Sequence, residues 1–323
     1  MAVLASLYDC IAEPLAEVRR TFDAQIRSDV PFVNDLCKHI ARFRGKMLRP
    51  ALVLLTGQAG GRLRQDHVGL ATVVEMVHVA TLVHDDVLDE SDVRRRLPTV
   101  NHLKGNEAAV LLGDHLIAHA FRYCNSLGLP FGSDLIGRTT NTICEGELLQ
   151  VHHRGNWALT EEEYFEIIGR KTASLTATCC VLGAYYAGAG AEVVSALRQY
   201  GYEVGVAFQI VDDVLDVVGH QESTGKTLGR DLEQGELTLP LVHYLRHAEP
   251  AGRAEALGVL GNGHLGRAET IRRLLSNSQS IEYAMGTARK RIEQACRNLD
   301  VLEPSAARDA LAAVADFIFH RQQ

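Results

Sequence analysis

The amino-acid sequence predicts an all-α protein, a single large helical bundle that occupies residues 1–323 as one domain. Apolar residues recur at helical spacing through most of the chain, and the eight prolines fall mostly between the periodic segments. Neither a run of short alternating strands nor a strand–helix–strand rhythm occurs. Long helices with short breaks favour a bundle whose ligand site lies in a central cavity between facing helices.

The sequence also predicts where the helices begin and end. Turn-forming residues at Gly60-Gly61, at Gly128 to Pro130 and at Gly188 to Gly190 predict breaks between helices. The uncharged stretch from Thr172 to Ala191 contains several threonines and glycines, which favours a buried core helix over a membrane span. Segment 219–236 is polar and long for a simple connection, which is typical of a functional loop. Helices are expected over residues 3–28, 32–44, 48–60, 66–89, 106–127, 132–152, 161–188, 192–218 and 237–247, with three or more after residue 250.

Composition narrows the class of protein. A formal net charge of −7 gives no electrostatic support for a nucleic-acid partner. Polar residues interrupt the first apolar residues early, so no signal peptide is predicted. The seven cysteines form no Cys-x-x-Cys pair, which is typical of free thiols in a reducing compartment. We therefore expect a cytoplasmic protein without a membrane span.

One acidic pentapeptide, Asp-Asp-Val-Leu-Asp, occurs twice, at Asp85–Asp89 and at Asp212–Asp216. Each copy follows apolar residues, where closely spaced carboxylates need positive partners. The first and last aspartates of each copy share one helix face. A single copy is most often a solvated helix end, but two such faces opposed across a cavity form an oxygen cage suited to Mg²⁺.

Basic residues accompany both copies in the sequence. Each alone is most often a solvated surface charge. Together with carboxylates they indicate a polyphosphate ligand, with metal ions bridging from the carboxylates and cations binding the remaining oxygens. These residues are Lys46, Arg49 and His78 before the first copy, Arg94, Arg95 and Arg96 after it, and Lys171 and Lys226 on either side of the second.

The motifs resemble those of trans-isoprenyl diphosphate synthases, most closely the bacterial octaprenyl-type long-chain enzymes. The resemblance covers residues 40–245 and is highly specific as a combination. It implies the isoprenoid synthase bundle and a Mg²⁺-dependent prenyltransferase that joins isopentenyl diphosphate to an allylic diphosphate, head to tail and in trans. It also implies a homodimer. The matching segments are His84 to Ser91 with Arg94-Arg95, Phe208 to Asp216, Gly45 to Pro50, Gly113-Asp114, Glu145 to Gln150, Lys171-Thr172 and Thr238 to Pro240.

The resemblance further implies roles for single residues. The expected ligands of a trinuclear Mg²⁺ cluster are Asp85, Asp89 and Asp212, supported by Asp86, Asp213 and Asp216, with Asp216 also a metal candidate. The residues expected to hold the allylic diphosphate are Arg94, Lys171, Thr172, Gln209 and Lys226. Those expected to hold isopentenyl diphosphate are Lys46, Arg49, His78 and Arg95.

The chemistry agrees with these roles. Breaking the allylic C–O bond builds charge on pyrophosphate, which metal ions and cations such as Arg94 and Lys171 stabilise. The isopentenyl double bond then attacks the allylic cation at near-attack distance. A proton is lost to the departing pyrophosphate, and no protein nucleophile is required.

Two positions depart from the family pattern. Arg96 stands where a glycine usually follows the two arginines, and Glu236 stands where the loop normally carries a lysine. An inward-pointing Glu236 would weaken diphosphate binding by up to a few kcal/mol. Compensation by Arg230 or Lys226 would remove that cost.

Product length is expected to depend on the helix that leads into the first copy, because the family's product grows along it. Side chains four and five positions before Asp85 stack on its face. These are Thr81 and Ala80, with Val77 one turn earlier, and none is aromatic. A long product, beyond geranylgeranyl, is favoured. The alternatives are that the small residues only pack the core and that the protein is a geranylgeranyl diphosphate synthase.

Three other functions are weaker. A class I terpene cyclase needs an aromatic-lined pocket, and aromatic residues make up only 6% of the chain. A metal-dependent phosphohydrolase could use His78, His84-Asp85 and the pair His115 and His119, but it leaves the second acidic copy unexplained. A non-catalytic subunit of a heteromeric synthase, which Glu236 suggests, would be expected to lose motif aspartates, yet all six are retained.

Overall fold

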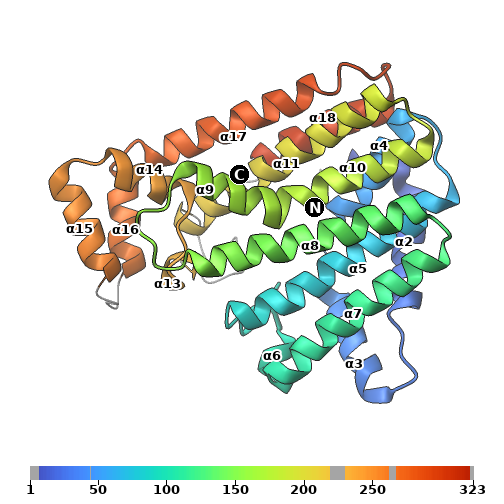
Figure 1. The fold of residues 1–323 in the computed structure, drawn as a ribbon, viewed down its shortest axis with the longest axis horizontal. Helices are drawn as coiled ribbons and strands as arrows, with labels where there is room; N and C mark the ends of the chain where they lie inside the picture. The colour runs from blue at the N-terminus through green and yellow to red at the C-terminus, as the bar shows by residue number, and fades with distance from the viewer. Residues whose placement is uncertain (1–6, 44, 219–229, 262–266, 321–323) are drawn as a thin grey trace. The chain divides into compact units, whose positions relative to one another are not determined.

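The computed structural model describes residues 7–43, 45–218, 230–261 and 267–320. These residues are predominantly helical, which confirms the all-α prediction (Figure 1). The described part contains one sheet, a two-stranded antiparallel hairpin of β1 (Val93–Arg94) and β2 (Leu97–Pro98). The sequence did not predict this hairpin, because strands of two residues leave no periodic signal.

The fold divides into two compact units. The first comprises Met1–Asn141, Leu175–Gly201 and Asn298–Val314, and the second comprises Thr142–Ser174, Tyr202–Arg297 and Ala315–Gln323. The expected single domain stays a prediction.

In the first unit, α5 is the central helix. It is apolar on nearly all its faces, as a helix enclosed by others must be, and α2, α4 and α7 pack against it. The elements of this unit are η1 (Asp9–Ile11), α2 (Ala12–Gln25), α3 (Pro31–Ile40), η2 (Ala41–Phe43), α4 (Leu48–Gly60), α5 (Gln65–Leu88), the hairpin, α6 (Val100–Lys104), α7 (Asn106–Ser126) and parts of α8 (Pro130–His152), α10 (Ser174–Ala187), α11 (Ala191–Val218) and α18 (Ala306–His320).

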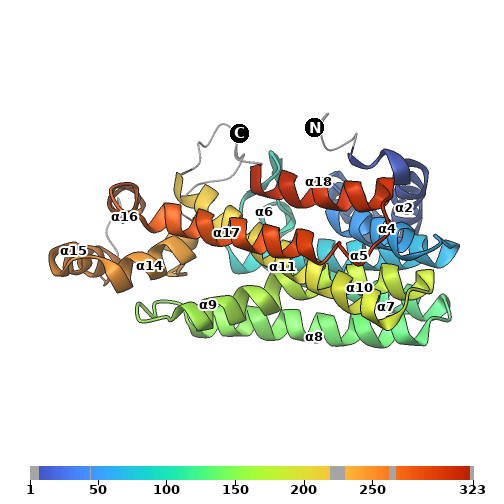
Figure 2. The same cartoon turned by 90° about the horizontal axis from the view of Figure 1, so that it is seen from above.

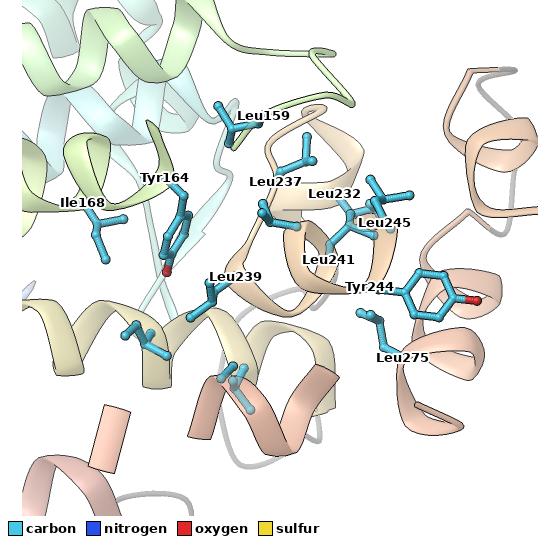
Figure 3. Close-up of a cluster of buried hydrophobic side chains, with 14 of the residues drawn as sticks. Leu159, Tyr164, Ile168, Leu232, Leu237, Leu239, Leu241, Tyr244, Leu245 and Leu275 are labelled. Carbon is cyan, nitrogen blue, oxygen red and sulfur yellow. The ribbon is translucent and has the colours of Figure 1, made fainter. Parts of the chain in front are cut away.

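In the second unit, apolar side chains from α9, α13, α14 and α16 form a common core (Figure 3). Helix α9 begins with a capping box, in which Thr160 and Glu163 satisfy each other's backbone N–H groups. Figures 1 and 2 show α14, α15 and α16 grouped together. The elements that lie wholly in this unit are α9 (Glu161–Ile168), η3 (Gly169–Ala173), α13 (Arg230–Glu233), α14 (Leu239–His247), α15 (Pro250–Gly261), α16 (Arg267–Ser276) and α17 (Ser280–Arg297).

Most expected helices are present near their predicted bounds. The expected helix over residues 161–188 is interrupted by a π-helical turn, η3. The short helix α6 was not predicted. Most of the predicted functional loop, 219–229, lies outside the described residues.

One described helix, α5, is long and apolar enough to cross a membrane by length and composition, but 78% of its apolar stretch is buried inside the fold. A core helix passes the same test, so this is weak support for a span. Helix α10 is almost wholly buried, which confirms the core-helix prediction for that stretch. All seven cysteines are free thiols.

Candidate active site

The first acidic motif forms the carboxyl end of α5. Asp85 and Asp86 lie in its last turns, and Asp89 caps it by donating its backbone N–H to Asp85 O at 2.8 Å. Asp86 is buried, with 2% of its surface exposed, whereas Asp85 and Asp89 are half-buried. The motif therefore has one inward carboxylate and two that reach the surface.

The β1–β2 hairpin brings Arg94 back onto this helix end. Arg94 Nε donates a hydrogen bond to Asp86 Oδ1 at 2.8 Å. Asp86 Oδ2 is buried and has no hydrogen-bond partner among the described residues. Burial raises the pKa of Asp86, and the Arg94 guanidinium opposes that rise. Arg94 therefore balances the inward carboxylate, and Asp85 and Asp89 are the carboxylates of this motif that a cation can reach from the surface.

Backbone contacts fix the hairpin to the helix. Asp86 O accepts hydrogen bonds from Ser91 N at 2.8 Å and from Asn101 Nδ2 at 3.2 Å. Ser91 O in turn accepts from the Thr99 hydroxyl at 2.5 Å. The position of Arg94 is thus set by the loop and not by the ion pair alone.

Basic side chains surround His78 in the same unit. Arg49 donates through its terminal guanidinium nitrogen to His78 Nε2 at 3.0 Å, so this ring nitrogen accepts and the imidazole is neutral. Burial first, and then the guanidinium groups of Arg49, Arg95 and Arg94, hold the pKa of His78 well below its usual range. A group of cations held this close indicates an anionic ligand.

Gly45 provides space for one of these cations. Arg95 donates a hydrogen bond to Phe43 O, and its guanidinium lies over Gly45. A Cβ at position 45 would lie 2.2 Å from that guanidinium. Lys46 follows as an exposed side chain. The segment from Gly45 to Pro50 therefore shapes the basic cluster through its glycine as well as its charges.

The second acidic motif lies near the end of α11, and its middle carboxylate is again the buried one. Asp213 Oδ2 accepts from the Tyr164 hydroxyl at 2.6 Å, and Oδ1 accepts from Gln209 Nε2 at 2.8 Å. Gln209 Oε1 accepts from the Thr172 hydroxyl at 2.9 Å. Burial raises the pKa of Asp213 to about 7, and the hydrogen bonds from Tyr164 and Gln209 oppose the rise. Asp212 is half-buried beside this network.

Lys171 and Thr172 lie in the π-helical turn η3, a departure from the α-helix that often marks functional sites. Lys171 Nζ forms an ion pair of 3.0 Å with Glu147 on α8. Gly146 allows the close approach, because a Cβ there would lie 2.6 Å from the backbone nitrogen of Lys171. The Glu-Gly-Glu motif therefore supports the predicted phosphate-binding lysine.

A cavity opens beside the second motif, within the second unit. Arg272 Nε donates to Val217 O at 2.7 Å at the end of α11. The lining includes Asp216, Val217, Glu236, Thr238, Leu241 and Arg272.

Glu236 is neutralised inside its unit. Arg154 contacts Glu236 Oε1 through Nε at 2.9 Å and through a terminal guanidinium nitrogen at 2.8 Å. The expected compensation by Arg230 or Lys226 concerns side chains outside the described residues. The partner in the structure is instead Arg154.

Within each unit the structure brings several of the predicted site residues into contact. Asp86 with Arg94, Arg49 with His78, and the chain from Thr172 through Gln209 to Asp213 are direct contacts. Lys226 lies outside the described residues. Tyr164, Arg154 and Arg272 were missed, because none belongs to a motif.

The donors suit Mg²⁺ in kind. All the candidate ligands are carboxylate oxygens, as this ion prefers. Among the described residues, no group of three His, Cys, Asp or Glu side chains is close enough to hold a metal unaided. Such an ion would therefore rely on water and on substrate phosphates for much of its coordination.

Comparison with known proteins assigns the family. The polyprenyl synthetase family model matches residues 30–276. The chain belongs to the polyprenyl synthetase family. This confirms the predicted family and its prenyltransferase class.

Several relatives and solved structures resemble the chain along most or all of its length. Octaprenyl diphosphate synthase of Escherichia coli (strain K12) is 35% identical and covers 99% of each chain. The short chain isoprenyl diphosphate synthase of Methanothermobacter thermautotrophicus is 36% identical over 88% of this chain and 89% of its own. The crystal structure of a decaprenyl diphosphate synthase from Rhodobacter capsulatus superposes with a TM-score of 0.93 at 34% identity, covering 99% of each chain.

Proposed function

We propose that this polyprenyl synthetase is a Mg²⁺-dependent enzyme that extends an allylic diphosphate with isopentenyl diphosphate to a long trans-prenyl chain. One observation supports this most directly. In both acidic motifs the middle carboxylate is buried and hydrogen-bonded to a fixed partner, Arg94 for Asp86 and Tyr164 for Asp213. The flanking aspartates are half-buried and suited to an external ligand.

We assign the metal-binding role to the flanking aspartates of each motif. Mg²⁺, when bound, supplies electrostatic stabilisation of the charge that builds on departing pyrophosphate. Asp86 and Asp213 then act as supports that hold the two helix ends in shape. The proposed ligands are Asp85, Asp89, Asp212 and Asp216, and the proposed cluster is trinuclear.

The basic residues bind the two diphosphates. Arg94 uses its Nε for Asp86, and we propose that its terminal nitrogens bind the allylic diphosphate. Lys171, oriented by Glu147, supplies a second cation for the allylic diphosphate. Arg94 and Lys171 stabilise the departing pyrophosphate more than the intact allylic diphosphate, and positioned cations accelerate ionisation in this way.

We propose the cluster around His78 as the isopentenyl diphosphate site. His78 accepts from Arg49 through Nε2, so a neutral ring carries its proton on Nδ1 and presents a hydrogen-bond donor there. Arg49, Arg95 and Lys46 supply positive charge around it. This site requires no acid–base residue, because the proton leaves with pyrophosphate.

Small residues before the first motif support a long product. Ala80 and Val77 are fully buried, and Thr81 is half-buried with its hydroxyl bonded to His78 O at 2.9 Å. No aromatic side chain occupies these positions. The relatives' names span short-chain to decaprenyl products, and the octaprenyl enzyme of E. coli matches along 99% of the chain. We favour a product beyond geranylgeranyl, with geranylgeranyl as the alternative.

We also propose a cytoplasmic homodimer. Leu103 on α6 and Val110 and Leu111 on α7 are exposed apolar side chains, and Leu111 has 67% of its surface accessible. Apolar side chains gathered on adjoining helices are typical of an interaction surface. Light scattering of the wild type and of Leu111→Glu tests this: a dimer that becomes a monomer supports the proposal, and a wild-type monomer contradicts it.

Incubation of the purified protein with Mg²⁺, labelled isopentenyl diphosphate and farnesyl diphosphate tests the activity. Chromatography of the extracted products should show a ladder that ends at one length beyond geranylgeranyl, and EDTA should abolish it. A product that stops at geranylgeranyl contradicts the long-chain proposal alone. No incorporation with any allylic primer would favour a non-catalytic subunit.

A further inference from the structure

The carboxylate of Glu236 is largely buried, and both of its oxygens have partners. Only 11% of its side chain is exposed. Oε1 takes both contacts from Arg154, and Oε2 accepts a hydrogen bond from the side-chain amide of Gln150. A buried carboxylate is stable only with such partners, and here both oxygens have one.

Backbone contacts join the same two segments. Gly155 N–H donates to Gly235 O at 2.8 Å. Gly235 has a φ of +77°, in the region that favours glycine, and a Cβ there would lie 3.1 Å from Gly155 N. The turn after α8 is therefore joined to the segment before α14 by a main-chain bond, an ion pair and an amide.

This joined segment forms part of the cavity beside the second motif. Glu236 and Thr238 line that cavity together with Asp216. The cavity also contains Arg272, which binds the end of α11 through Val217 O. The placement of this part of the cavity wall thus depends on the contacts of Glu236 with Gln150 and Arg154, which do not line the cavity.

We propose that Gln150, Arg154 and Glu236 are positioning residues for the second acidic motif, and that Glu236 does not bind the diphosphate. The three side chains hold the segment from Gly235 to Thr238, and this segment keeps the surroundings of Asp216 in the shape that the reaction needs. The inference rests on the proposed prenyltransferase function. It explains why an anion is tolerated at position 236, since its charge is balanced by Arg154.

Exchange of the two charges tests the proposal. Glu236→Lys places a cation beside Arg154, and Arg154→Glu places an anion beside Glu236, so each single variant should lose at least about tenfold in kcat. The double variant Arg154→Glu/Glu236→Lys restores an ion pair and should recover to within about threefold of the wild type. The Mg²⁺ concentration that gives the half-maximal rate should rise in each single variant and return to the wild-type value in the double variant.

The KM for isopentenyl diphosphate separates positioning from general damage. Its proposed ligands, Arg49 and His78, belong to the other unit, so this KM should stay near the wild-type value in every variant. If Glu236→Lys fails to fold, Glu236→Gln takes its place. Glutamine has the shape of glutamate and keeps the contact with Gln150. The kcat of Glu236→Gln should fall by a smaller factor than that of Arg154→Glu.

A matched control uses the exposed ion pair of Arg273 and Glu255, 2.5 Å apart in the same unit and outside the cavity lining. Arg273→Glu, Glu255→Lys and their double should leave kcat and the Mg²⁺ requirement unchanged. Parallel losses in this control set would mean that any charge change in the unit is harmful, and would overturn the proposal.

Two other results overturn it. A Glu236→Lys enzyme faster than the wild type would show that position 236 faces the substrate and prefers a cation. Singles that lose activity without recovery in the double would show that the pairing is not what matters. If the wild type transfers no prenyl group, the proposed function fails instead, and thermal unfolding of the same variants still measures whether the charge exchange restores the pair.

Discussion

Arg95 and Arg96 form the turn between β1 and β2 with φ values of +52° and +65°. Two successive left-handed residues between paired strands are the backbone of a type I′ turn, which favours asparagine and glycine. The family's usual glycine at position 96 thus has a conformational reason. Arginine adopts this backbone at a cost of about 1–2 kcal/mol.

Arg96→Gly should therefore stabilise the protein. Relief of the left-handed strain is partly offset by the entropy of glycine in the unfolded chain, so we expect a gain of up to about 1 kcal/mol. Urea unfolding measures this. Arg42→Gly in η2, where φ is negative, should lower stability by about 0.5–1 kcal/mol. Equal effects at both positions would contradict the argument.

The Asp86–Arg94 pair should be needed for catalysis. Arg94→Gln leaves a buried carboxylate without its cation, so the pKa of Asp86 rises further and the end of α5 loses its partner. We expect kcat/KM for the allylic diphosphate to fall at least about a hundredfold. Steady-state kinetics measure this. Arg96→Gln, two residues along, should change kcat/KM less than about threefold, and a comparable loss there would show that net charge alone matters.

Features that depend on neighbouring residues could be predicted from the sequence. The helices and the two acidic motifs are properties of neighbouring residues, so spacing alone indicates them. Tyr164 and Arg154 could not be found this way, because their partners lie 49 and 82 positions away. Even a correct helix assignment leaves open which residues such helices bring together.

The Arg94 hairpin and the π-helical turn show a second limit. Both are short departures from regular helix, and both carry predicted site residues. The hairpin depends on Asn101, which donates to Asp86 O near the end of α5, and on Thr99, which donates to Ser91 O in the loop before the hairpin. The turn at Lys171 depends on the space at Gly146. The sequence could identify Arg94 and Lys171 as basic residues near an acidic motif, but not the backbone that aims them.

Tyr164→Phe should destabilise the fold and slow the reaction. The phenol donates the 2.6 Å hydrogen bond to a buried carboxylate, Asp213. Loss of such a bond costs about 1–3 kcal/mol. Chemical denaturation and initial rates measure the two effects. Tyr283→Phe, whose hydroxyl binds Glu161 at the surface, is the matched control and should cost less than about 1 kcal/mol.

Stability should fall in mild acid because of His67. Its Nδ1 accepts from Arg64 N at 3.0 Å and its Nε2 contacts Gly183 O at 3.0 Å, so the folded ring is neutral. Burial lowers the pKa of His67 in the folded state, while the unfolded chain keeps a value of about 6.5. Below that pH the unfolded state binds more protons, and the free energy of unfolding drops by up to about 1.4 kcal/mol per pH unit.

Urea unfolding at pH 7.5, 6.5 and 5.5 checks this pH dependence. His67→Gln keeps an amide donor for Gly183 and should flatten the slope below about pH 6.5. His102→Gln, at an exposed histidine, should leave the slope as in the wild type. An unchanged slope in His67→Gln would show that other groups, such as His78, carry the effect.

Thr81→Phe should shorten the product. Thr81 is half-buried four positions before Asp85, so a phenyl ring has room to project beside the growing chain without disrupting the core. Ala80→Phe should shorten it too, but Ala80 is fully buried and overpacking should cost about 1–3 kcal/mol. Product chromatography with farnesyl diphosphate as primer measures chain length, and thermal unfolding measures the cost. A full-length ladder from a stable Thr81→Phe enzyme would mean that the product does not pass this face of α5.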